Sequence, residues 1–125
     1  MNWMNLDLKA AETAAALAKK ATGLTKSEAE KINQQAASVL AHQGLSAFFL
    51  HLKVNKKPWA REIASQSYEL LRTAWPEVLD PSKGSPLDEI APFGQELGRL
   101  IEGKQLVDQM LIYLRYHTKT LPGTD

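Results

Sequence analysis

Apolar residues recur at three- and four-residue steps along most of this chain of 125 residues, and that period constrains the fold more than any motif. This spacing places apolar side chains on one face of an α-helix, whereas a half-buried strand needs strict alternation. No alternating run enriched in β-branched residues occurs. We therefore predict an all-α fold, with residues 1–125 forming a single-domain helical bundle of five to seven helices and no sheet.

Local signals predict where the first two helices begin and end. Residues 5–21 are rich in Ala, Leu, Lys and Glu, and Gly23 follows them. Thr25 and Glu28 then form a capping box, in which a hydroxyl and a carboxylate satisfy free amide donors at a helix start. The second helix is expected to stop near Gly44.

Three further helical segments follow. A short, very apolar helix is expected over residues 45–52, and Pro58 is well placed to begin a fourth helix that closes at Trp75. Residues 76–86 read as an internal loop, with a short helical turn at its end that Pro92 interrupts. The predicted core contains Phe48, Phe49, Leu52, Ile63, Leu70, Leu111 and Leu114.

The C-terminal part is expected to contain two helical pieces. The first covers about residues 93–102, and Gly103 is predicted to break it. The second covers residues 104–120 and carries a stripe of apolar residues that faces the core.

Charge is segregated along the chain, although the net charge is only +1. Residues 1–61 carry nine Lys and Arg against four acids, whereas residues 62–103 carry three against eight. From Lys31 to Arg61 there is no acid at all. An acid-free surface with lysines suits a polyanion, because each neutralised phosphate releases counterions and no carboxylate repels the ligand. A solvated, lysine-rich turn is the alternative interpretation.

Signals for catalysis are absent from the sequence. There is no cysteine, and His42, His51 and His117 have no zinc-site spacing. The glycine of Gly44-Leu45-Ser46 has no second glycine to complete a nucleophile elbow. We expect no enzyme, no catalytic residue, no metal and no cofactor, unless scattered residues assemble a site. With no readable signal peptide and no long apolar run, we expect a cytoplasmic protein with no membrane partner.

The aromatic residues have two possible roles. Phe48 and Phe49 lie in the most apolar segment and are assigned to the core. Trp59 could stack on a base, but at a helix start we favour packing onto a neighbouring helix. Tyr113 and Tyr116 fall on different sides of the last helix, so at least one faces solvent or a partner.

Two segments carry a resemblance to a known family. Residues 36–50, AASVLAHQGLSAFFL, and residues 109–116, QMLIYLRY, resemble the small subunit of the CRISPR type III-B (Cmr) RNA-targeting effector complex. The resemblance extends from about residue 30 to the closing helix. The sequence departs from the family at residues 117–120, HTKT, which replace a more basic and apolar ending.

The resemblance implies a non-catalytic subunit of an antiviral defence complex. Several copies would stack into a filament beside the subunits that hold the guide RNA and help to line the target-RNA channel, while other subunits cleave. The implied partners are those subunits, further copies of this chain, and the target and guide RNA backbones. Together with the acid-free tract, it yields six RNA-binding candidates: Lys53, Lys56, Lys57, Arg61, Arg115 and Lys119.

Two rival functions come from other classes. A DNA-binding helix-turn-helix around Gly44 would need a polar recognition helix, and residues 45–52 are too apolar to lie in a groove. A helical protein–protein adaptor without a nucleic-acid role stays open.

Overall fold

The computed structural model describes residues 3–21, 23–76, 79 and 97–121, and in this part the chain forms five α-helices and no strand. The helices are α1 (Trp3–Lys19), α2 (Lys26–Gln43), α3 (Leu45–Val54), α4 (Pro58–Ala74) and α6 (Leu97–Thr118). The all-α prediction is therefore confirmed. The total number of helices and the single-domain organisation stay predictions. The predicted loop over residues 76–86 and the turn near Pro92 lie almost entirely outside the described residues.

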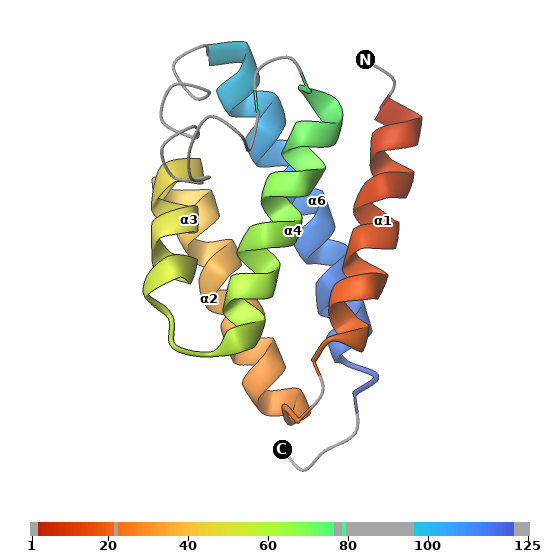
Figure 1. Cartoon of the computed structure of the whole chain (residues 1–125), viewed down its shortest axis with the longest axis vertical. Coiled ribbons are helices and arrows are strands. Elements are labelled where there is room, and N and C mark those ends of the chain that lie inside the picture. The colour runs from red at the N-terminus through yellow and green to blue at the C-terminus, as the bar shows by residue number, and fades with distance from the viewer. Residues whose placement is uncertain (1–2, 22, 77–78, 80–96, 122–125) are drawn as a thin grey trace.

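The helices run up and down along the long axis of the bundle (Figure 1). Helices α1, α3 and α6 run in one direction, and α2 and α4 run in the other. Helix α6 packs against each of the other four, most extensively against α1. As a result, the carboxyl ends of α1, α3 and α6 meet the amino ends of α2 and α4 at one end of the bundle. We call this the lower end, as it appears in Figure 1.

One hydrophobic core joins all five described helices. The phenyl rings of Phe48 and Phe49 pack edge to face, with centroids 5.2 Å apart, and both side chains are buried. Trp59 of α4 is also buried. The predicted core is confirmed, since all seven of its members are buried: Phe48, Phe49, Leu52, Ile63, Leu70, Leu111 and Leu114.

Two local signals place helix boundaries as expected. The hydroxyl of Thr25 accepts a hydrogen bond from the amide of Glu28 at 3.1 Å, which confirms the hydroxyl half of the predicted capping box. The Glu28 carboxylate makes no hydrogen bond to a described residue. Gly44 ends α2 by donating its amide to the Leu40 carbonyl, and its own carbonyl accepts from Phe48 in the first turn of α3. Its φ of 95° lies in the region that favours glycine. Gly44 therefore ends α2 and directly precedes α3.

The predicted break at Gly103 is wrong. Helix α6 begins at Leu97 and continues without interruption through Gly103, which is buried. A glycine inside a helix costs only about 1 kcal/mol relative to alanine, and tertiary packing can offset that cost. The boundaries of α1, α3 and the end of α6 differ from the predictions by about two residues, a usual error for helix ends.

Candidate nucleic-acid interface

Four exposed cations lie in and beside the turn between α3 and α4, and we call this group the basic corner: Lys53, Lys56, Lys57 and Arg61. Lys53 lies in the last turn of α3, and Arg61 lies in the first turn of α4. The side chain of Asn55 closes the turn, because its Oδ1 accepts a hydrogen bond from the amide of Lys57 at 2.9 Å. Four of the six predicted RNA-binding residues therefore lie in this turn or within one helical turn of it.

The basic corner is held against α1 from its inner side. Trp59 is only 3% exposed, and its Nε1 donates a hydrogen bond to the carbonyl of Leu17 at 2.8 Å. A second link joins the same helices at the surface, where Lys20 Nζ lies 3.1 Å from Glu62 Oε2. The interpretation of Trp59 as a core residue rather than a base-stacking residue is confirmed.

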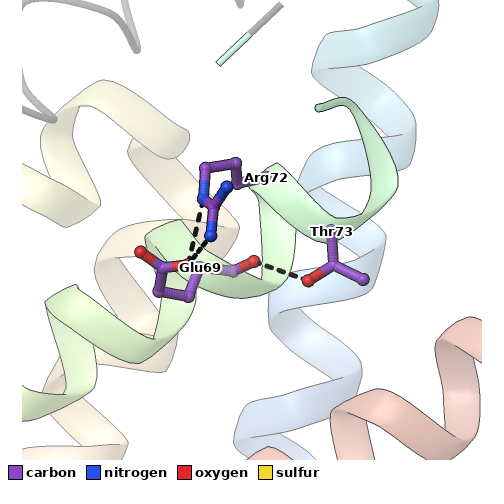
Figure 2. A network of polar contacts seen from close by, with 3 residues as sticks. All are labelled: Glu69, Arg72 and Thr73. Atoms are coloured by element: carbon purple, nitrogen blue, oxygen red, sulfur yellow. Dashed lines mark hydrogen bonds and ion pairs between the residues drawn. The ribbon is translucent and has the colours of Figure 1, made fainter. Parts of the chain in front are cut away.

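No cation of the basic corner forms an ion pair or side-chain hydrogen bond with another residue in the described part of the chain. Other cations are engaged within the protein. Arg72 donates from Nε and Nη2 to Glu69 Oε2 at 3.0 and 2.7 Å, and Thr73 donates to the Glu69 carbonyl (Figure 2). The charge of the basic corner is therefore available to an external anion.

The up-and-down arrangement brings further cations to the lower end. Lys19 and Lys20 lie at the end of α1, and Lys26 begins α2. Lys26 could not be assigned to this end from the sequence, because the sequence does not show which helix ends lie together. Short connections between successive helices were the available signal, because they predict antiparallel neighbours and thus alternating ends.

Arg115 and Lys119, the two other predicted RNA-binding residues, lie in a different setting. Both are exposed near the end of α6, and both line a groove of about 360 Å³ between α2 and α6. Glu30 and Asp108 line the same groove. Because acids accompany these cations, the groove presents charges of both signs, and it suits a polyanion less well than the basic corner does.

A buried amide lies in the wall of the same groove. Asn33 is 4% exposed, and its Nδ2 donates to the carbonyl of Leu111 at 3.3 Å, which links α2 to α6. Its Oδ1 has no hydrogen-bond partner among the described residues. The hydrogen bond from Nδ2 fixes the relative register of the two helices that form the groove.

The described residues contain no cluster of three or more His, Asp or Glu that could hold a metal ion. Among the helices in that part of the chain, none has the length and apolar character needed to cross a membrane. The three histidines lie on separate helices, α2, α3 and α6. His42 Nδ1 lies 2.9 Å from the carbonyl of Ser38 within its own helix.

Comparison with known proteins returns no match, whether to a family model, to a curated protein or to a solved structure. Two surface regions at the lower end carry charge, the basic corner and the α2–α6 groove. The basic corner offers cations without internal partners, and the α2–α6 groove offers mixed charge. Of these two surfaces, the basic corner suits an anionic ligand better, because no described acid pairs with its cations.

Proposed function

We propose that this chain is a non-catalytic RNA-binding subunit that contacts the sugar-phosphate backbone through the basic corner. The observation that carries the proposal is the group of four exposed cations in and beside one turn, without an acid partner in the described part of the chain. The resemblance to the CRISPR type III-B small subunit supports a more specific role. On that basis the chain is a cytoplasmic small subunit of such an effector complex.

The physics of the corner predicts weak, sequence-independent binding by a single copy. Lysine and arginine contacts to phosphates carry no base information, so any RNA sequence is acceptable. Each contact to a single strand contributes about 0.7 to the slope of log affinity against log salt, which gives a slope of about −3 for four contacts. A non-specific dissociation constant on the order of 10⁻⁴ to 10⁻⁶ M is expected at physiological salt.

Assembly of several copies would raise this affinity. Copies bound along one RNA multiply the phosphate contacts through effective concentration, without any new type of contact. The segregated sequence charge, +5 over residues 1–61 and −5 over residues 62–103, favours a head-to-tail association. A heterologous contact that does not close produces a filament, as the resemblance implies.

The RNA contact is tested with the triple variant Lys56→Glu, Lys57→Glu, Arg61→Glu. Fluorescence anisotropy with labelled single-stranded RNA is measured across a salt series, for the isolated chain and for the assembled complex. We expect a loss of affinity of at least tenfold and a flatter salt dependence, with thermal unfolding unchanged. Unchanged affinity and slope would move the RNA-binding surface away from the corner.

The assembly role is tested by co-expression with the neighbouring genes. We expect the chain to co-purify in a large ribonucleoprotein, in more than one copy by native mass spectrometry. A ribonucleoprotein that forms and contains no copy of this chain would refute the assignment to the effector complex.

A helical protein–protein adaptor is the alternative function, and one observation favours it. Leu50 and Val54 are 54% and 68% exposed, and lie one turn apart on the outer face of α3. Exposed apolar residues so close together suit a protein partner. The adaptor predicts partner binding that the triple variant leaves unchanged.

A further inference from the structure

We propose that Tyr116 on α6 is a stacking platform for an unpaired RNA base, with Lys119 beside the ring. This inference rests on the proposed function and adds a non-ionic contact to it. The side chain of Tyr116 is 64% exposed, so most of the ring is accessible to a ligand. Its hydroxyl makes no hydrogen bond to any described residue.

The other tyrosine of α6, Tyr113, has a structural role. Tyr113 is half-buried, and its hydroxyl donates a hydrogen bond to Asp7 Oδ1 of α1 at 2.8 Å. Tyr113 therefore connects two helices, whereas Tyr116 forms no such connection. The two residues are three positions apart and therefore only about 60° apart around the helix. Tyr113 lies on the side of α1, and Tyr116 lies toward solvent.

The surroundings of Tyr116 suit a nucleotide. Lys119, directly after the end of α6, places its Nζ over the Tyr116 ring at 5.6 Å from the centroid, in a cation–π contact. Arg115 is exposed and directly precedes the tyrosine. A base stacked on the ring would therefore have a flanking phosphate within reach of Lys119, whereas Arg115 points about 100° away from Tyr116 around the helix. Every base has a π-face, so this contact is as tolerant of sequence as the contacts of the basic corner.

The stacking contact also predicts whether the bound RNA is single-stranded or double-stranded. Bases of a duplex already stack on one another, whereas an unpaired base can lie against an exposed aromatic ring. Tyr116 should therefore favour single-stranded RNA over a duplex of the same length. A purely ionic surface would show no such preference for a stackable base.

The experiment compares Tyr116→Ala, Tyr116→Phe and Tyr116→Leu in the full-length chain. Their affinity for labelled single-stranded RNA is measured by anisotropy across a salt series. Removal of the ring in the Ala and Leu variants should weaken binding by roughly 5- to 100-fold, as measured for stacked bases elsewhere. The salt slope should not change, because no charge is lost. The Phe variant should bind like the parent.

Two controls separate a stacking contact from other effects. Lys119→Gln should reduce the salt slope by about 0.7, which is the ionic signature that the tyrosine variants must lack. Leu50→Ala removes another exposed apolar side chain, 54% exposed on α3, and should leave the affinity unchanged. The Tyr116→Leu variant keeps an apolar side chain, so a loss of RNA affinity in that variant is caused by the missing aromatic ring.

Several outcomes would overturn the inference. Full affinity in the Ala and Leu variants would remove the ring from the interface. An equal loss in the Phe variant would assign the effect to the hydroxyl. Reduced self-association with unchanged RNA affinity would assign Tyr116 to a protein contact. If the parent binds RNA and the basic-corner triple variant does not, while Tyr116→Ala does, only the stacking inference fails. If the parent itself does not bind RNA, alone or in the complex, the proposed function fails too.

Discussion

The basic corner and the distal half of α4 carry the same kinds of charge in different electrostatic states. Around Arg72, the guanidinium is engaged by the carboxylate of Glu69 at 2.7 Å (Figure 2). Around Lys56 and Lys57, no described acid lies within ion-pair distance. Arg72 is half-buried, whereas Lys56 and Lys57 are exposed, yet both groups reach the surface. What differs is whether a carboxylate of the same chain already neutralises the cation, and that decides which charges remain for a ligand.

The two faces of α3 differ as well. The inner face of α3 contributes the buried Phe48, Phe49 and Leu52, while Lys53 lies outside. Stability and RNA binding should therefore respond to different substitutions a few residues apart. The following predictions test that separation, beginning with the largest effect.

Phe49→Ala should lower the free energy of unfolding by about 3–5 kcal/mol, because it empties a buried site beside Phe48. Urea denaturation followed by circular dichroism measures the loss. Leu50→Ala, at the neighbouring exposed position, should change stability by no more than about 0.5 kcal/mol. If the two variants proved equally stable, the inner face of α3 would not be the core that the structure shows.

Trp59→Phe should lower the free energy of unfolding by about 1–3 kcal/mol, because the indole donor to the Leu17 carbonyl is lost. The salt slope of RNA binding should stay at its parental value, since Trp59 is buried beneath the cations. Thermal unfolding and anisotropy together check this. A drop in RNA affinity without a loss of stability would instead place the indole against RNA.

Thr25→Ala should cost about 1 kcal/mol, because the amide of Glu28 loses its capping acceptor at the start of α2. Thr25→Ser retains a hydroxyl acceptor and serves as the matched control. Denaturation midpoints compare the two. Equal losses in both variants would show that the hydrogen bond is not the source of the effect.

Arg72→Gln should have the smallest effect, about 0.2–0.5 kcal/mol, as expected for an exposed pair three residues apart on a helix. RNA affinity should be unchanged, because this cation is already engaged. A clear loss of RNA binding would mean that a cation already paired with a carboxylate of the same chain still binds RNA.

The sequence predicted those features whose causes are local. The cap at Thr25 and the start at Pro58 depend on residues within one turn, and both are found where expected. Gly103 was misread because its local preference opposes a helix that tertiary packing maintains. A single sequence shows the preference and not the packing.

The candidate site was predictable only in part. The acid-free tract marks the basic corner because its residues are close in the sequence. The convergence of Lys19, Lys26 and Arg115 at the lower end depends on helix direction, which periodicity does not show. Likewise, the sequence predicts that at least one of Tyr113 and Tyr116 faces solvent or a partner, but only the structure shows that Tyr116 is the exposed one.

The central claim is that the cations of the basic corner, and not net charge in general, bind the RNA backbone. The most direct test compares two variants with the same change in net charge: Lys56→Gln with Lys57→Gln, and Lys9→Gln with Arg72→Gln. The second pair removes cations that Glu12 and Glu69 already engage. The measured quantity is the salt dependence of affinity for single-stranded RNA. The account predicts a slope reduced by about 1.4 in the first variant and unchanged in the second. Equal changes in both would contradict it.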